Sequence, residues 1–101
     1  MKKELERYRN LDDLAKELGL SETDIALMKF KKKVIAKLRK AREKKDLTQV
    51  QVAKMMNTKQ PAIARMEVGL LSEVSIDFLI KTAWVLEVKL PHFPSHPTKA
   101  A

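Results

Sequence analysis

Two side chains with planar hydrogen-bonding groups, Gln60 and Arg65, lie five residues apart in one short segment. A glutamine amide can pair with N6 and N7 of adenine, and an arginine guanidinium with O6 and N7 of guanine. The major groove of DNA is wide enough for a helix, and each base pair shows a distinct edge there. On one exposed helix face, the two side chains suit the recognition of base edges.

Residues near this pair suit contacts with the DNA backbone. Lys54 and Lys59 are point charges suited to phosphate oxygens. Gln49 is expected to begin the preceding helix, where its backbone N–H and its side-chain amide can both face a phosphate. The alternative for Gln49 is a polar residue without a partner, and for Lys54 a solvated surface position.

Residues 48–69 have the pattern of two short helices joined by a tight turn. Thr48 is a good N-cap, and Gln51 stands three residues later, as a capping box requires. Apolar residues then recur at helical spacing and predict one buried face. These residues are Val52, Ala53 and Met56.

The turn and the second helix have signals of their own. Asn57 tolerates a left-handed turn conformation. Pro61 falls in the first turn of a helix that begins near Thr58 and Lys59, where its missing N–H costs little. Gly69 suits the end of that helix.

The periodicity of the second helix decides which of its side chains are exposed. Ile63 and Met66 are expected in the core. Gln60, Ala62 and Arg65 are then left on the outward face, where the Ala62 methyl suits contact with a thymine methyl. The sequence therefore predicts a helix-turn-helix whose second helix enters the groove with its N-terminal residues first.

Two helices are predicted before this unit, over residues 11–18 and from Ser21 to about Lys45. Gly19 ends the first, and Ser21 with Asp24 begins the second. The long helix has an apolar stripe that belongs in the core. The stripe consists of Ile25, Leu27, Phe30, Val34, Ile35, Leu38 and Ala41.

After the unit, Ser75 with Asp77 predicts a last helix over 75–87. Trp84 lies beside its apolar stripe and is expected to be a core or dimer contact rather than a ligand site. Residues 88–90 alternate like a very short strand, which needs a second edge or a partner chain. The predicted fold class is all-α, with about five helices and a short C-terminal strand pairing across a dimer. The stripe of the last helix is Ile76, Leu79, Ile80, Ala83 and Leu86.

The net charge of +8 gathers in one part of the chain. Residues 29–65 hold thirteen lysines and arginines against Glu43 and Asp46, whereas residues 1–26 are slightly acidic. The positive charge coincides with the predicted helix-turn-helix, so double-stranded DNA is the simplest polyanionic partner. The alternative is a solvated lysine-rich face.

The length of 101 residues suits one domain with a modest core. No apolar run approaches the length of a membrane span, and no hydrophobic signal segment follows the basic start, so no membrane contact is expected. The absence of cysteine excludes disulfides and thiolate metal sites and suits a cytoplasmic protein.

Two histidines raise the question of a metal site. His92 and His96 have the spacing that suits a metal on a helix, but Pro91, Pro94 and Pro97 prevent that helix. No cysteine nucleophile, glycine-rich phosphate loop or Gly-x-Ser-x-Gly pattern occurs. The sequence therefore predicts no metal, cofactor or catalytic residue, and the protein is not expected to be an enzyme.

Three short patterns carry a resemblance to a known family. L-T-Q-x-x-V-A at 47–53, Q-x-x-I at 60–63 and R-x-E-x-G at 65–69 resemble the lambda-repressor/Cro-like helix-turn-helix proteins, also called the xenobiotic-response-element type. L-G-L-S at 18–21, with the basic helix after it, is similar to HigA-like antitoxins, which repress their own toxin–antitoxin operon. The resemblance covers about residues 31–87. The chain is divided accordingly into an N-terminal helical extension (1–30), a DNA-binding domain (31–90) and a flexible tail (91–101).

The resemblance implies base contacts at four positions of the second motif helix, those of Gln60, Pro61, Ala64 and Arg65. Pro61 and Ala64 cannot hydrogen-bond through their side chains, so fewer bases would be read directly and more specificity would come from DNA shape. Thr58, where the family commonly has an apolar residue, completes the predicted DNA-binding set. The set is Gln49, Lys54, Thr58, Lys59, Gln60, Pro61, Ala62, Ala64 and Arg65.

Two further implications concern stability. Arg42 and Glu67, 25 residues apart, are expected to form an ion pair that braces the second motif helix. The family usually has glycine where this chain has Glu87, so the last helix is expected to run on or to end differently.

The predicted function is a sequence-specific DNA-binding transcriptional regulator, a repressor that binds a promoter as a homodimer. The alternative is an antitoxin that neutralises a small toxin protein by direct binding and also regulates its own operon. Residues 1–26, outside the common motif, are then the expected toxin contact.

Overall fold

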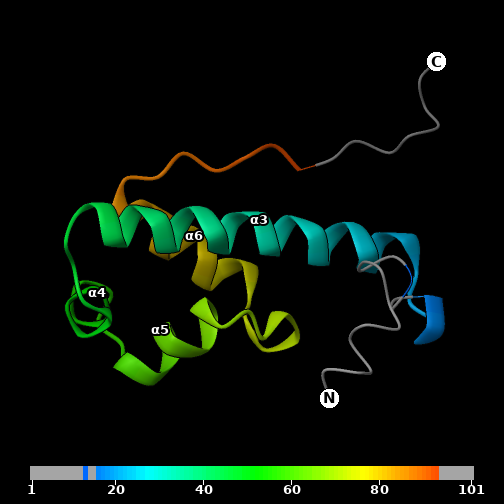
Figure 1. Ribbon diagram of the computed structural model, residues 1–101, viewed down its shortest axis with the longest axis horizontal. Helices are drawn as coiled ribbons and strands as arrows, with labels where there is room; N and C mark the ends of the chain where they lie inside the picture. Colours follow the sequence, from blue (N-terminus) through cyan, green and yellow to red (C-terminus); the bar gives the residue numbers. More distant parts are fainter. Residues whose placement is uncertain (1–12, 14–15, 94–101) are drawn as a thin grey trace.

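Four α-helices and a 3₁₀ turn account for most of the described part of the protein, residues 13 and 16–93 of a computed structural model. No strand occurs in this part, and the all-α class is confirmed. Half of the residues of the helix predicted over 11–18 lie outside it, and of the described half residues 13, 16 and 17 are helical. Figure 1 shows α3 spanning the molecule, with α4 and α5 to one side of it. The elements are α3 (Glu22–Lys44), α4 (Gln49–Met55), α5 (Gln60–Glu67), the turn η1 (Leu71–Glu73) and α6 (Ile76–Leu86).

Capping boxes begin both α3 and α4, which confirms the box predicted for α4 and the start predicted for α3 at Ser21 with Asp24. The Ser21 hydroxyl accepts from the backbone N–H of Asp24 over 3.1 Å, and the Asp24 carboxylate accepts from the backbone N–H of Ser21 over 3.2 Å. Thr48 and Gln51 repeat this arrangement over 3.0 and 2.7 Å. Each cap satisfies N–H groups that the first helical turn leaves unpaired. α3 runs through residues 30 and 31 without a break, so it joins the N-terminal extension to the helix-turn-helix.

The turn between α4 and α5 is closed by backbone geometry. Asn57 has a φ of 56°, a left-handed conformation that asparagine adopts more readily than most residues. The backbone N–H of Thr58 donates to the Ala53 carbonyl over 2.8 Å. α5 then begins at Gln60 with Pro61 in its first turn. The direction of α5 is therefore determined within a few residues of the end of α4.

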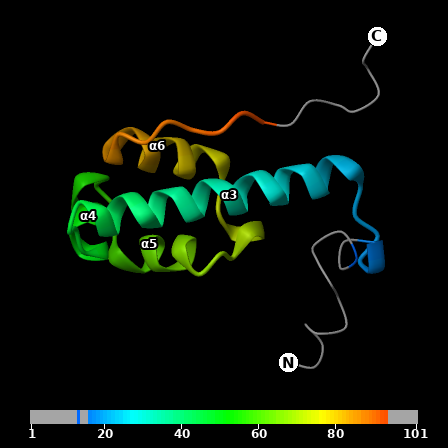
Figure 2. The same cartoon turned by 45° about the horizontal axis from the view of Figure 1, so that its top comes forward.

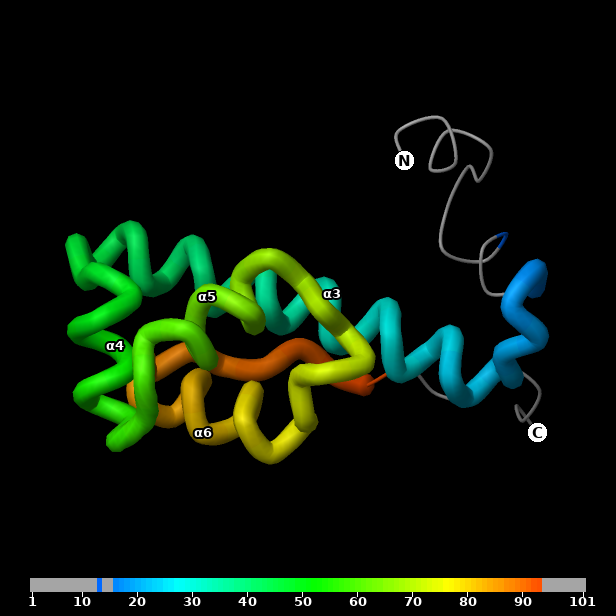
Figure 3. Tube along the Cα trace, turned by 90° about the horizontal axis from the view of Figure 1, so that it is seen from below, coloured from blue at the N-terminus to red at the C-terminus, as the bar shows by residue number. Residues whose placement is uncertain are grey.

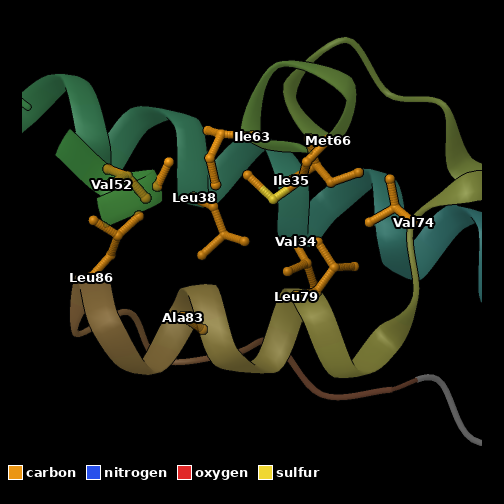
Figure 4. Packing of buried hydrophobic residues seen from close by; sticks show 11 residues of the cluster. Val34, Ile35, Leu38, Val52, Ile63, Met66, Val74, Leu79, Ala83 and Leu86 are labelled. Carbon is orange, nitrogen blue, oxygen red and sulfur yellow. The ribbon is translucent and has the colours of Figure 1, made fainter. Parts of the chain in front are cut away.

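The inward faces of the helices meet in one core (Figure 4). Leu38 of α3, Ile63 of α5 and Leu79 of α6 are each at most 1% exposed. Burying a side chain of this size contributes about 1.5–3 kcal/mol. Both motif helices are thus anchored through apolar residues predicted for their inward faces. The cluster consists of Val34, Ile35, Leu38, Val52, Ala53, Ile63, Met66, Val74, Leu79, Ala83 and Leu86.

The buried stripe of α6 differs from the prediction. Ile80 is expected in the core but is 49% exposed, whereas Thr82 is fully buried. The Thr82 hydroxyl donates to the Phe78 carbonyl over 2.7 Å, which satisfies the buried polar group. Trp84 is 85% exposed, so it is not a core residue. The helix is rotated so that Ile80 and Trp84 lie toward the surface.

The chain turns sharply after α6 and runs back along α3 (Figures 1 and 2). Glu87 ends the helix with a φ of 58°, the conformation that glycine would supply at no steric cost. The expectation of a different helix end is therefore wrong: the glycine-type end forms with a glutamate.

Residues 88–93 carry no strand. The Phe93 ring lies 5.1 Å from the ring of Phe30, and the Lys37 ammonium donates to the Lys89 carbonyl over 3.4 Å. The segment thus neighbours a helix, which offers no backbone edge for strand pairing. Its pairing across a dimer stays a prediction.

Candidate nucleic-acid interface

α5 exposes only part of the predicted set. Pro61 and Arg65 are exposed on the outward face of the helix. Ala62 is half-buried and lines, with Thr58 and Arg65, a hollow of about 310 Å³ beside residues 73–75. Ala62 is therefore only partly outward, because a helix of about 3.6 residues per turn places it to one side of the face that Pro61 and Arg65 share. Gln60 is likewise half-buried.

Gln60 is held by Gln49 at the start of α4. The Gln60 amide nitrogen, Nε2, donates to Oε1 of Gln49 over 2.7 Å. Gln49 in turn donates from Nε2 to Oε1 of Glu67 over 2.9 Å. These three side chains form a hydrogen-bonded row that links the first residue of α5 to its last through the first residue of α4. The row fixes the orientation of the Gln60 amide in the free protein.

Arg42 of α3 anchors the other end of the row. Its Nε donates to Oε2 of Glu67 over 2.6 Å, and its Nη2 donates to Oε1 over 3.0 Å. Its Nη1 donates to the Leu47 carbonyl over 2.7 Å. The two ionic side chains are only 14% and 4% exposed. Such a two-pronged, largely buried contact is stronger and more directional than a surface ion pair.

The charges of this pair are fixed by their surroundings. Burial, the largest single influence, raises the pKa of Glu67, but the hydrogen bonds from Arg42 and Gln49 and the charge of Arg42 together lower it below its ordinary value. The hydrogen bond to Glu67 raises the pKa of Arg42 against the opposing effect of burial. Both groups are therefore charged at neutral pH, and their charges cancel beneath α5.

The Gln60 amide keeps the groups that adenine pairing requires. An amide has two N–H donors and a carbonyl oxygen with two lone pairs. One of the two N–H groups of Gln60 donates to Oε1 of Gln49. The second N–H is left for adenine N7, and Oε1 is left for the N6 amino group. Gln49 therefore orients Gln60 and leaves it the groups that the predicted pairing would need.

The side-chain amide of Gln49 makes other contacts than those predicted for it. Its side-chain amide, expected to face a phosphate, is bonded to Gln60 and Glu67. Its backbone N–H belongs to the first turn of α4, where N–H groups lack helical partners. The side-chain half of the predicted phosphate contact is therefore engaged within the protein, and the backbone half stays a prediction.

The lysines near α5 fall into two groups. Lys54 and Lys59, on either side of the turn, are exposed. Lys31 donates instead to the Leu71 carbonyl over 2.9 Å and fixes η1 against α3. The remaining members of the predicted set are half-buried: Thr58 and Ala64.

Sequence patterns do not predict the contact between Gln49 and Gln60. The two residues are 11 positions apart and belong to different helices, so no helical periodicity links them. The available signal is positional, since each is the first residue of its helix. The tight turn at Asn57 brings the two helix starts together.

A family model described as helix-turn-helix matches residues 38–93, more than half of the chain. The protein belongs to this helix-turn-helix family. Its type is lambda-repressor/Cro-like, as the sequence patterns predict. No curated protein and no solved structure gave a match. The family is a DNA-binding regulatory domain and not a family of enzymes, so this helix-turn-helix protein is a DNA-binding transcription regulator.

Two other kinds of site were sought in the described part of this helix-turn-helix protein. None of its helices there is both long and apolar enough to cross a membrane. Residues 13 and 16–93 also contain no cluster of three histidine, cysteine, aspartate or glutamate side chains able to hold a metal. His92 lies there outside any helix, and His96 lies outside the described residues.

Proposed function

We propose that this helix-turn-helix protein is a sequence-specific repressor that inserts residues 59–67 into the major groove. The observation that carries the proposal is the 2.7 Å hydrogen bond between Gln60 and Gln49, with Gln49 itself bonded to Glu67. It orients an amide at the N-terminal end of α5, the end that enters the groove first in such motifs. An amide oriented in advance loses less conformational entropy on pairing with a base.

Gln60 and Arg65 are the proposed base-reading residues. Gln60 pairs with adenine and Arg65 with guanine, and each pairing supplies about 1–3 kcal/mol of discrimination. Five helical residues separate them by roughly 7.5 Å along α5, which lets both reach one half-site. Pro61 and Ala64 contribute shape and apolar contact only, so DNA deformability supplies the rest of the specificity.

The contacts proposed for the DNA backbone fix α5 in place. The exposed ammonium groups of Lys54 and Lys59 bind phosphates, and the backbone N–H of Gln49 binds a third. Thr58 lines the same hollow as Arg65 and is the fourth residue proposed to contact the DNA at this edge. These contacts add affinity without sequence preference.

Repression follows from occupancy of a promoter. Proteins with this motif bind as dimers to two half-sites about one helical turn apart. We therefore propose a homodimer on an inverted repeat that overlaps the site of transcription initiation. A reporter gene behind such a site is expected to be expressed less when the protein is present.

Selection of bound duplexes from a random pool tests the proposal. We expect a recurrent motif that contains adenine and guanine at a fixed separation, repeated in inverted orientation at about one helical turn. A bound pool with no enriched motif would exclude sequence-specific recognition. A motif without the inverted repeat would exclude the dimeric mode but retain the reading residues.

An antitoxin function is the second candidate. Leu18, in the segment that resembles HigA-like antitoxins, is 63% exposed and lies outside the matched residues 38–93. An exposed leucine there suits contact with a second protein. A neighbouring reading frame for a small basic toxin, together with co-purification of its product with this chain, would support the antitoxin function. A repressor with no such neighbour would contradict it.

A further inference from the structure

Trp84, on α6, is the most exposed of the large apolar side chains in the described residues, at 85%. Ile80, one helical turn before it, is 49% exposed, and Met55 at the end of α4 is 50% exposed. None of the three belongs to the core cluster of buried side chains. Exposed apolar patches of this kind mark interaction sites, and interface cores are enriched in tryptophan and methionine.

A groove of about 380 Å³ lies beside Trp84, between the end of α4 and α6. Lys81 is the one charged residue that lines it. A projecting indole and an apolar hollow therefore stand side by side on one surface, which we call the Trp84 patch. Its members are Met55, Met56, Ile80, Lys81, Trp84 and Val85.

We propose that the Trp84 patch is a twofold interface with a second copy of this chain, in which each Trp84 enters the groove of the other copy. A twofold interface uses the same patch on both partners, so the patch must be complementary to itself. A knob next to a hole satisfies this condition. The patch carries no acidic group and a single lysine, so an apolar contact suits it better than a charged partner.

The position of the patch is compatible with the DNA-binding mode. In Figure 3, α5 lies toward the viewer, whereas α4 and α6 lie at the edges of the molecule. A twofold axis along the viewing direction, next to these edges, leaves both copies of α5 facing the same way. Two helices on one face are what an inverted repeat requires. The proposal thus rests on the proposed function for its biological role, but not for its test.

Salt separates this association from DNA binding. Each chain carries a net charge of +8, so two copies repel, and added salt screens the repulsion. The dimer is therefore expected to tighten as salt rises, whereas DNA binding weakens through counterion release. The opposite directions distinguish the two equilibria.

The fluorescence of Trp84 tests the interface without DNA, because it is the only tryptophan of the chain. We expect its emission to shift to shorter wavelength as protein concentration rises, in step with a change from monomer to dimer in sedimentation. An emission that stays constant while the protein dimerises would place the interface elsewhere and overturn the proposal. A protein that stays monomeric at every concentration would overturn it as well and leave the patch to another partner.

Variants complete the test. Trp84→Ala and Met55→Glu are each expected to weaken dimerisation about thirtyfold or more, the effect of losing a central interface residue. The control is Val68→Ala, which alters an exposed apolar residue outside the patch (72% exposed) and is expected to leave dimerisation unchanged. Thermal melting of dilute Trp84→Ala protein is expected to match the parent monomer, because this indole is outside the core. Dimerisation that survives both patch variants would refute the interface, whatever the result with DNA.

Discussion

Arg42 stabilises this fold through its ion pair with Glu67. The two side chains are 14% and 4% exposed and are joined by two hydrogen bonds. Removing one partner leaves the other charge buried and unpaired, which typically costs about 3–5 kcal/mol. We expect Arg42→Ala to lower the free energy of unfolding by that amount in urea titration.

The matched control for Arg42→Ala is Arg39→Ala. Arg39 pairs with Glu43 over 3.3 Å on the same helix, but these side chains are 57% and 54% exposed. Exposed pairs contribute at most about 1 kcal/mol. Equal losses in the two variants would show that the buried pair has no special role.

The protonation of Glu67 adds a pH dependence. Its pKa is lowered in the folded protein, so the unfolded chain binds the proton more readily. The stabilisation is therefore complete above the pKa of an unfolded glutamate, about 4.3, and is lost as pH falls through the lower folded value. In urea titrations at a series of pH values, Glu67→Gln is expected to lose less stability below about pH 4 than the parent. An identical acid loss in both would contradict this role of Glu67.

At the residue scale, the sequence identifies candidate residues from their chemistry better than it predicts which side chains contact one another. Gln60 and Arg65 can be selected from their chemistry, and Arg42 with Glu67 from resemblance. The bond between Gln49 and Gln60 depends on where the turn places two helix starts, which no periodicity encodes. The partial burial of Ala62 and the full burial of Thr82 likewise depend on helix rotation, which apolar patterns locate only to within about one residue.

The elements themselves follow from local signals. Ser21 and Thr48 fix the starts of α3 and α4 through their capping boxes. Asn57 supplies the left-handed residue of the turn, as predicted. Residues 88–90 form no strand within one chain for a nonlocal reason, since the segment lies along α3 and not beside a strand, and pairing across a dimer stays a prediction.

Glu87, at the end of α6, has a strained backbone conformation, and a substitution can relieve this strain. Glu87 adopts a φ of 58°, which costs a residue with a Cβ atom about 1–2 kcal/mol relative to glycine. Glycine also gives the unfolded chain more freedom, which offsets part of that gain. We expect Glu87→Gly to raise the free energy of unfolding by about 0.5–1 kcal/mol.

Glu87→Ala is the matched control for this helix end. It removes the exposed contact of the Glu87 carboxylate with Lys45, 3.4 Å long, but keeps the Cβ atom. We expect no gain in stability from alanine. A gain as large as that of glycine would assign the effect to the carboxylate and not to the backbone.

At the scale of the whole molecule, charge placement predicts how binding responds to salt. Each phosphate contact contributes about 0.9 to the slope of log affinity against log salt. Lys54→Ala with Lys59→Ala is therefore expected to reduce the slope by about 2. Lys40 follows the buried Leu38 by two residues and thus lies on the opposite side of α3, so Lys40→Ala is the control that keeps the parent slope. Equal slopes for all three proteins would remove the lysines of the turn from the interface.

The most direct measurement compares the affinity of the Gln60→Ala/Arg65→Ala protein for the selected duplex and for a scrambled duplex. Two lost pairings are expected to reduce the difference in binding free energy by about 2–6 kcal/mol, while affinity for the scrambled duplex changes far less. Lys54→Ala is expected instead to weaken both complexes alike. If the double variant prefers the selected duplex as strongly as the parent does, α5 does not read the bases.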